Sequence, residues 1–193
     1  MTATNPPTDG RTPGSPVTPA TPRPPLSRQI VVAVLLLAAV FAVASLGSLA
    51  AIGNTDGWYA TVEKVPWNPP NSVFGPAWTV LYLLMAVAGY LVWRRGFRGR
   101  GSRNAATGTL VLFAAQLLAN GLWTPVFFAG YPVAGVAAWW AAMGIMVVLI
   151  VLVVALIVVA RRVSVAAAIL LLPYLAWLLF ASTLNAGIIA LNG

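Results

Sequence analysis

The sequence predicts an all-α integral membrane protein, a bundle of five transmembrane helices. Hydrophobic residues occupy 60% of its 193 positions and charged residues only 7%, whereas a soluble domain carries roughly a quarter charged residues. Apolar stretches without a charge recur along the chain, and their lengths suit a bilayer, because ~20 helical residues rising about 1.5 Å each cross its ~30 Å hydrocarbon core. If the chain crosses five times, every arginine falls on one side, as the positive-inside rule requires.

The composition also excludes several kinds of chemistry. The chain has a formal net charge of +8 and contains neither cysteine nor histidine. The basic residues border the apolar stretches, so membrane orientation explains them and no nucleic-acid partner is expected. Disulfides and thiol chemistry are excluded, and the commonest metal ligand and acid–base residue are missing. We therefore predict no metal site and no obligatory cofactor.

The first 27 residues differ from the rest of the chain. They are rich in proline, threonine and serine and show no apolar periodicity. Such a segment cannot bury enough apolar surface to offset the entropy lost on ordering. We predict a disordered tail over residues 1–27 and a five-helix transmembrane domain over residues 28–193.

The first charge-free stretch runs from Ile30 to Ile52 and predicts a span at about 29–52. The rival interpretation is a signal peptide cleaved near residues 48–50. Its apolar region is longer than the usual 7–15 residues and its leader is extended, so we favour a transmembrane span.

The second stretch, Phe74 to Trp93, predicts a span at about 74–95. The chain then carries no charge from Asn104 to Ala160, which is too long for one helix. Pro125 and the Gly130-Tyr131-Pro132 turn signal divide it into spans at about 105–128 and 133–160. The last stretch predicts a span at about 163–191. Pro173 inside it is tolerable where neighbouring helices satisfy the freed carbonyl.

The charges orient these five spans. The tail, the loop near 94–104 and the loop near 161–163 share one side, which the positive-inside rule makes the cytoplasm. We expect a multi-pass protein of the cytoplasmic membrane with a cytoplasmic N-terminus and an extracytoplasmic C-terminus. The other side holds Asp56, Glu63 and Lys64. Removing the first span would leave this asymmetry intact. The cytoplasmic side receives Arg11, Arg23, Arg28, Arg94, Arg95, Arg98, Arg100, Arg103, Arg161 and Arg162.

Amide side chains occur inside two of the spans. Gln116, Asn120 and Trp123 recur on one face of the third span, and Asn185 lies deep in the fifth. An amide without a partner in hydrocarbon costs several kcal/mol, so each should face the bundle interior. We favour hydrogen bonding between helices for Gln116 and Asn120, with ligand contact as the alternative.

Aromatic residues follow helical spacing in the second and fifth spans. A large ring beside a small side chain leaves a gap that suits a flat apolar ligand, although the same periodicity is equally typical of core packing. The two stripes are Phe74, Trp78, Tyr82 and Met85, and Tyr174, Trp177, Ala181 and Leu184.

Catalysis and ion-coupled transport find little support in the sequence. No span carries an acid, lysine or arginine in its interior, and no paired carboxylates or nucleophile–base arrangement is visible. An odd number of spans fits poorly with inverted-repeat transporters. We therefore do not expect a conventional enzyme.

Four segments of the chain form a recognisable series: Trp58-Tyr59, PWNPPNSVFGPAWTVLYLLMAVAGYLVWR, QLLANGLWTPVFF and PYLAWLLFASTLNAGIIALN. Together they are similar to the tryptophan-rich sensory protein family, also called the translocator or peripheral benzodiazepine-receptor family. The resemblance covers about residues 28–192, with the motifs in the same order and spacing.

This resemblance implies a five-helix bundle, usually a homodimer, that binds porphyrins and haem-like tetrapyrroles in a pocket open towards the first loop. Mammalian relatives also bind cholesterol and drugs. The segment at 67–70 would form part of a stiff lid. The family pattern assigns the pocket to Trp67, Trp123, Trp177, Ala181 and Leu184, with Trp58, Tyr59 and Asn120 as further contacts.

The leading functional hypothesis is a receptor or sensor that binds protoporphyrin IX or haem, with sterol-like or drug molecules as other candidate ligands. Without histidine or cysteine to ligate iron, recognition should rest on ring stacking and shape. The alternatives are light- and oxygen-dependent porphyrin degradation, in which Trp67 and Trp177 would take part, and transport of porphyrin or lipid. One departure from the family is Trp139, which stands where many relatives carry an aspartate, so any function needing that carboxylate is in doubt.

Overall fold

The computed structural model describes residues 24–98 and 106–193, which are helical and contain no β-strand. The prediction of disorder for residues 1–23 lies outside this part, and residues 26 and 27, which the sequence assigned to the tail, are the first turn of a helix. The elements are α1 (Leu26–Ala51), α2 (Trp58–Thr61), α3 (Asn71–Arg95), the 3₁₀ turn η1 (Gly96–Arg98), α4 (Thr107–Thr124), the π-helical turn η2 (Pro125–Ala129), α5 (Tyr131–Ala134), α6 (Val136–Val163) and α7 (Val165–Asn192).

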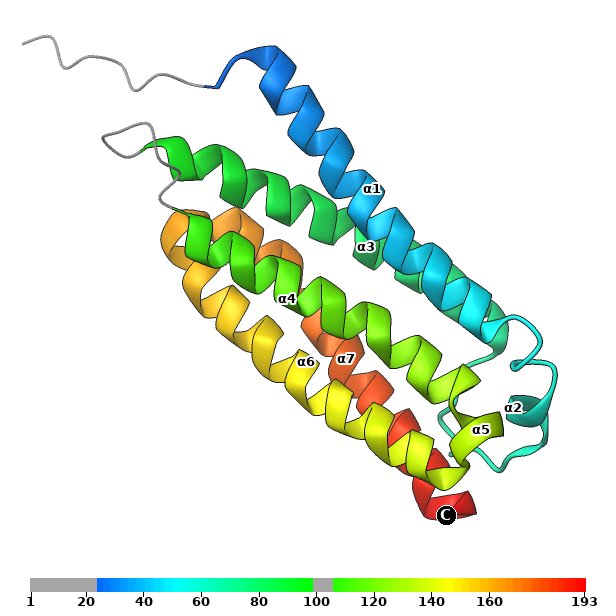
Figure 1. Ribbon diagram of the computed structural model, residues 1–193. Helices are drawn as coiled ribbons and strands as arrows, with labels where there is room; N and C mark the ends of the chain where they lie inside the picture. Colours follow the sequence, from blue (N-terminus) through cyan, green and yellow to red (C-terminus); the bar gives the residue numbers. More distant parts are fainter. Residues whose placement is uncertain (1–23, 99–105) are drawn as a thin grey trace, which may run out of the picture.

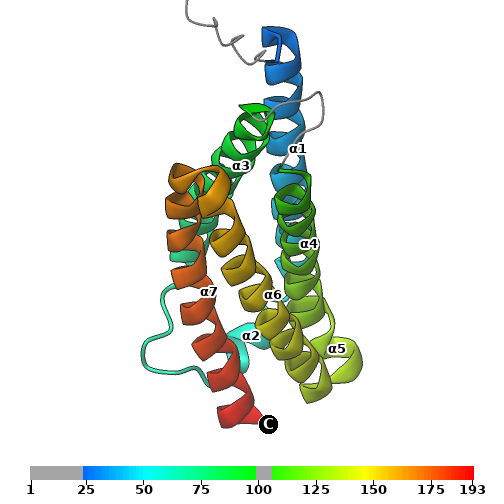
Figure 2. The ribbon, with the colours of Figure 1, turned by 90° about the vertical axis from the view of Figure 1, so that its left-hand side faces the viewer.

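Five of these helices are long and apolar enough to cross a membrane: α1, α3, α4 continued by η2, α6 and α7. This confirms the predicted fold class. In the bundle, α1 contacts α3 and α4, α3 contacts α7, and α6 contacts both α7 and α4. Figure 2 shows α3 and α7 on one side of the bundle and α1 and α4 on the other.

The first helix is the most loosely packed of the five. Val40 is its only buried residue, and Phe41 is 73% exposed. Figure 2 shows the N-terminal turns of α1, in blue, extending beyond the other helices. Most of its apolar side chains therefore lie on the outside of the bundle.

The two ends of the bundle differ in charge. The start of α1, the end of α3 and the turn between α6 and α7 lie at one end, whereas α2, α5 and the C-terminus lie at the other (Figure 1). At the first end Arg95 donates to Ser164 Oγ, which also caps α7 by accepting from the Ala167 N–H at 3.1 Å. The Arg28 guanidinium lies 5.1 Å from the centre of the Phe97 ring. These contacts tie three helix ends together there.

The third span continues through Pro125 to Ala129, close to the end at 128 that the sequence predicts. The chain continues as η2, where the Gly130 N–H donates to the Pro125 carbonyl at 3.0 Å across five residues. A proline has no N–H for the regular ladder, and a π turn is one way to absorb such an interruption. This turn sets the positions of Phe127 and Phe128, which line a cavity in the bundle. Helix α5 follows it, and Gly135, with a φ of 58°, leads into α6.

Candidate functional site

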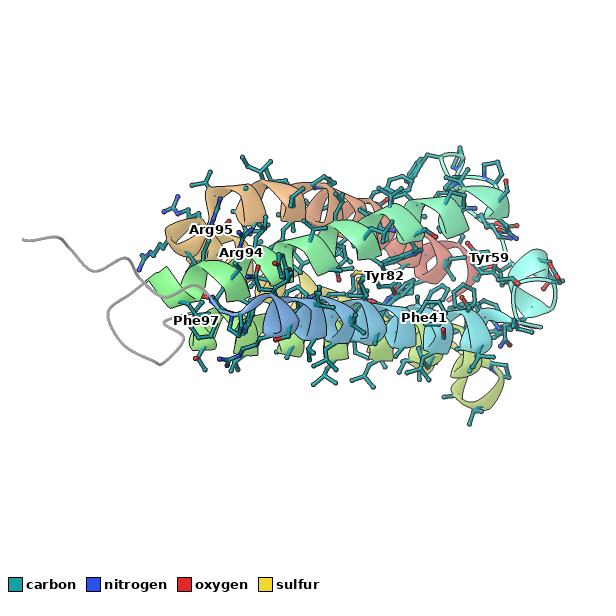
Figure 3. All side chains as sticks on the ribbon, turned by 90° about the horizontal axis from the view of Figure 1, so that it is seen from above. Phe41, Tyr59, Tyr82, Arg94, Arg95 and Phe97 are labelled. Carbon is teal, nitrogen blue, oxygen red and sulfur yellow. The ribbon has the colours of Figure 1, made fainter. Side chains whose placement is uncertain are left out.

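A cavity of about 400 Å³ lies between α1, α3, α4, η2 and α7. Tyr59 of α2 and Thr55 of the preceding turn place it near the α2 end of the bundle. Figure 3 shows Tyr59 at that end and Tyr82 further along. The lining consists of Ala44, Gly47, Ser48, Ala51, Thr55, Tyr59, Asn71, Phe74, Gly75, Trp78, Thr79, Tyr82, Trp123, Thr124, Phe127, Phe128, Trp177, Ala181, Leu184, Asn185 and Ile188.

One wall of the cavity is aromatic and comes from α3 and α7. Phe74, Trp78 and Tyr82 share a face of α3 because they are four residues apart, and Trp78 stacks on Tyr82 with ring centres 5.3 Å apart. Trp177 meets this row edge-on, at 5.9 Å from Phe74 and 6.3 Å from Trp78. Edge-to-face contacts of this kind hold rings in fixed orientations.

A second aromatic wall comes from α4 and η2. Trp123 stacks on Phe127 with ring centres 5.2 Å apart and an interplanar angle of 17°. Phe128 follows with its ring edge-on to Phe127, 5.0 Å away. Tyr59 extends this wall towards the loop, 5.3 Å from Phe128. The wall depends on the π turn, which holds Phe127 and Phe128.

The third wall consists of small residues on α1. Ala44, Gly47, Ser48 and Ala51 repeat every three or four positions and line the cavity. A methyl group added at Gly47 would meet Thr124 Oγ1 at 3.4 Å, an ordinary contact distance. Short side chains on this face leave the space that the aromatic walls enclose.

Polar groups lie at the rim and at one deeper point. Ser48, Asn71 and Thr79 are exposed lining residues. Asn185 is 1% exposed; it accepts from the Trp123 indole N–H at 3.4 Å and donates to the Trp139 carbonyl at 3.3 Å. Asn185 thus connects α4, α6 and α7 beside the cavity.

Five of the residues that the sequence assigned to a pocket line this cavity: Trp123, Trp177, Ala181, Leu184 and Tyr59. The other three do not line it. Trp67 is 56% exposed, and its indole N–H donates to Thr183 Oγ1 on α7 at 3.2 Å.

Asn120 is 4% exposed and acts as a link between helices. The Tyr82 hydroxyl donates to Asn120 Oδ1 at 3.0 Å, and Asn120 Nδ2 donates to the Tyr174 hydroxyl at 2.7 Å. The favoured expectation of interhelical hydrogen bonding describes this residue well. Gln116, one turn earlier, is fully buried and has no hydrogen-bond partner among the described residues.

Trp58 belongs to a second aromatic cluster, which also contacts Tyr59 and Phe128. Its indole N–H donates to the Phe128 carbonyl at 3.1 Å. Its ring lies 5.5 Å from the ring of Trp139, which is fully buried and stacks on Tyr131 at 4.3 Å and 3°. Trp139, which the sequence analysis singled out as a departure from the family, is therefore a buried ring in a stack.

Residues 62–70, here called the strap, run from α2 to α3 across α7. Three contacts hold them, at every second residue: Glu63 bonds to Asn192 at 2.9 Å, Val65 packs on Gly187, and Trp67 bonds to Thr183. Figure 2 shows this loop beside α7. Successive residues of the strap contact successively earlier residues of α7. The strap is therefore extended and runs antiparallel to the helix.

Two charged or titratable groups lie against each other here, Lys64 of the strap and Tyr59 of the cavity lining. Lys64 Nζ lies 4.7 Å from the centre of the Tyr59 ring and donates to the Val62 carbonyl at 3.2 Å. Burial raises the pKa of the Tyr59 hydroxyl above its ordinary value, and that hydroxyl lies 3.3 Å from Asn68 Oδ1. No group of three potential acidic, histidine or cysteine ligands occurs within residues 24–98 and 106–193.

The α1 wall and the two phenylalanines of η2 had no place in the predicted pocket. The only sequence signal for the former was the small-residue spacing of Gly47 and Ala51, which also suits close contact between helices. Phe127 and Phe128 lie within the quoted motif QLLANGLWTPVFF, but their register depends on a π turn that periodicity does not reveal.

The chain is similar in sequence to known proteins over most of its length. A sequence model of the TspO/MBR family matches residues 33–191. The tryptophan-rich protein TspO of Archaeoglobus fulgidus is 40% identical over 136 residues, 70% of this chain and 80% of that protein. The translocator protein of Homo sapiens is 38% identical over 130 residues, 66% of this chain and 70% of its own. The tryptophan-rich sensory protein of Cereibacter sphaeroides is 36% identical over 137 residues, 71% of this chain and 78% of its own.

Proposed function

The chain belongs to the TspO/MBR family, and from this premise we propose that it is a membrane receptor or sensor that binds a tetrapyrrole in the aromatic cavity. Protoporphyrin IX and haem are the proposed ligands, with sterol-like molecules and drugs as further candidates. Binding would use ring contacts and shape, since the sequence offers neither histidine nor cysteine for axial ligation of iron. A metal-free porphyrin should therefore bind about as well as haem.

The observation that carries this proposal is the shape of the cavity. Two aromatic walls and a wall of small residues enclose about 400 Å³, within the range of roughly 300–1,000 Å³ that small-molecule sites occupy. A flat ring placed between such walls gains offset or edge contacts worth about 0.5–1.5 kcal/mol each beyond its buried area. The cavity has apolar walls and a polar rim, which suits a ligand that is apolar in its body and polar at its edge.

A dark titration with protoporphyrin IX tests the proposal. The absorbance of the porphyrin reports binding to the wild type, to Trp177→Ala and to Trp140→Ala as a matched control, because Trp140 on α6 is 61% exposed and does not line the cavity. We expect saturable binding that Trp177→Ala weakens and Trp140→Ala leaves unchanged. Equal, non-saturating uptake by all three proteins would mean that the porphyrin only partitions into detergent.

Light- and oxygen-dependent porphyrin breakdown is the second candidate function. It is favoured by three tryptophans, Trp78, Trp123 and Trp177, that line the cavity, within reach of a bound ring. Trp67 lies outside that lining, so Trp177 is the better candidate for a direct role. Illumination should then produce a defined product with turnover, and Trp177→Phe should stop it. Bleaching at the rate seen in empty detergent would count against this activity.

Orientation, assembly and transport complete the proposal. We place the arginine-bearing end in the cytoplasm. Because the chain contains no cysteine, a single cysteine introduced at exposed Ser27 would report the side of that end by labelling in intact cells.

A homodimer is the assembly that the resemblance implies, and light scattering in detergent measures it. Transport of porphyrin or lipid would require flux into proteoliposomes that is absent from protein-free vesicles.

A further inference from the structure

Lys64 occupies an unusual position among the basic residues. Within residues 24–98 and 106–193 it is the one cation at the α2 end of the bundle, because the described arginines lie at the starts and ends of helices at the opposite end. Its ammonium lies 4.7 Å from the centre of the Tyr59 ring, and Tyr59 lines the cavity. The charge is therefore separated from the cavity by about one aromatic ring.

The ammonium of Lys64 has a neutral partner only. It donates to the Val62 carbonyl at 3.2 Å, and no carboxylate lies within ion-pair distance of it among the described residues. The two acids of this end, Asp56 and Glu63, are exposed, whereas Lys64 is half-buried, and neither acid lines the cavity. A partly buried cation gains most from a charged hydrogen-bond acceptor.

The cavity lining at the start of α3 offers a further polar group that suits an anion. Asn71, at the amino end of α3, lines the cavity, and this helix end has no side-chain cap. The N–H groups of its first turn carry the positive end of the helix dipole. Lysine has a flexible four-carbon stem, so its ammonium can move across the ring of Tyr59 to meet a group at the rim.

We infer that Lys64 binds a carboxylate of the ligand, so that the site selects flat apolar rings bearing an acidic side chain over neutral rings of the same shape. This inference rests on the proposed tetrapyrrole binding and adds a specificity-determining residue to it. The ring lies between the aromatic walls, and its carboxylate extends past Tyr59 to the strap. No covalent step is involved.

The experiment compares protoporphyrin IX with its dimethyl ester, which keeps the ring and lacks the charge. Both are titrated in the dark against protein in phosphatidylcholine nanodiscs, using the wild type, Lys64→Gln, Lys64→Arg and Arg94→Gln. Arg94→Gln is the matched control because it removes one positive charge from the exposed opposite end of the bundle. We expect Lys64→Gln to lower the affinity for the free acid by about tenfold, as loss of a charged hydrogen bond would. Affinity for the ester should not change.

The remaining arms separate a binding role from a packing role. Lys64→Arg should keep the affinity for the free acid. Added salt should weaken binding of the free acid more in the wild type than in Lys64→Gln. If Lys64→Gln weakens acid and ester alike, or neither, the inference is overturned while binding in the cavity stands. If neither compound binds the wild type saturably, the inference and the proposed function fall together.

Discussion

The side-chain amide of Asn192 pairs with both backbone polar groups of Glu63. Its Oδ1 accepts from the Glu63 N–H at 2.9 Å, and its Nδ2 donates to the Glu63 carbonyl at 2.9 Å. The same Nδ2 also donates to the Ile188 carbonyl at 2.9 Å, which fixes the amide against its own helix. A single side chain at the end of α7 thus satisfies a residue of the strap much as a neighbouring strand would.

Asn192→Ala should release this end of the strap. The two bonds are exposed, so we expect less than about 1 kcal/mol of global destabilisation. The local effect is larger, because the Glu63 N–H loses the acceptor that Asn192 provides. Hydrogen exchange measured at Glu63 should accelerate, whereas Leu191→Ala, an exposed neighbour, should not change it. Unaltered exchange in Asn192→Ala would show that the strap is held elsewhere.

Gly187 allows the strap to lie directly on α7. A methyl group at this position would lie 2.3 Å from Val65 Cγ1, and all three of its nearest contacts belong to Val65. Gly187→Ala should therefore destabilise the protein by about 1–3 kcal/mol, the usual cost of overpacking. The matched control is Gly144→Ala on α6, where no atom lies within 4 Å of the added methyl.

A double variant separates this clash from helix effects. In Gly187→Ala/Val65→Ala the nearest remaining atom would be the Cβ of residue 65, at 3.5 Å. Thermal unfolding in detergent should then show a favourable coupling energy between the two substitutions. Purely additive losses would contradict direct packing of the strap on α7.

Two neighbouring amides on α4 should respond oppositely to the same substitution. Asn120→Leu leaves the half-buried Tyr82 hydroxyl and the buried Tyr174 hydroxyl without their shared partner, at a cost of about 1–3 kcal/mol. Gln116→Leu removes an amide that has no partner among the described residues, so it should be neutral or stabilising. Thermal unfolding measures both. If Gln116→Leu is destabilising, water or a ligand hydrogen-bonds to the Gln116 amide.

The helices and the aromatic stripes follow from the sequence because their causes are local. Charge-free length determines the five long helices. The spacing of Phe74, Trp78 and Tyr82 places them on one face of α3 whatever that face contacts. Whether such a face is core or cavity depends on the helix opposite, and there the sequence allowed both interpretations. The α1 wall makes this face of α3 part of a cavity, because the small residues of α1 leave the space open.

The position of Trp67 could not be derived from the sequence in the same way. It lies in a proline-rich segment without periodicity, and its contact, Thr183, is 116 residues away. The course of that segment depends on Gly187 and Asn192, whose roles become visible only once α7 lies beside it. The assignment of Trp67 to the pocket stays a prediction, and the structure places this ring on the strap, where it can act on ligand binding through the position of the strap.

Ala181 gives the most direct control over the size of the cavity. It is 6% exposed and lines the cavity on α7, one turn after Trp177. Ala181→Phe would put a ring into the space proposed for the ligand, and because that space is open, the ring should fit with little of the strain that overpacking usually brings. Porphyrin affinity should fall at least about tenfold while the unfolding temperature changes little, a loss of about 1.4 kcal/mol in binding alone. Ala186→Phe, on the exposed face of the same helix, should leave affinity unchanged. Because the two variants add the same ring to the same helix, normal binding by Ala181→Phe would place the ligand outside this cavity, and equal loss in both would point to a general effect on α7.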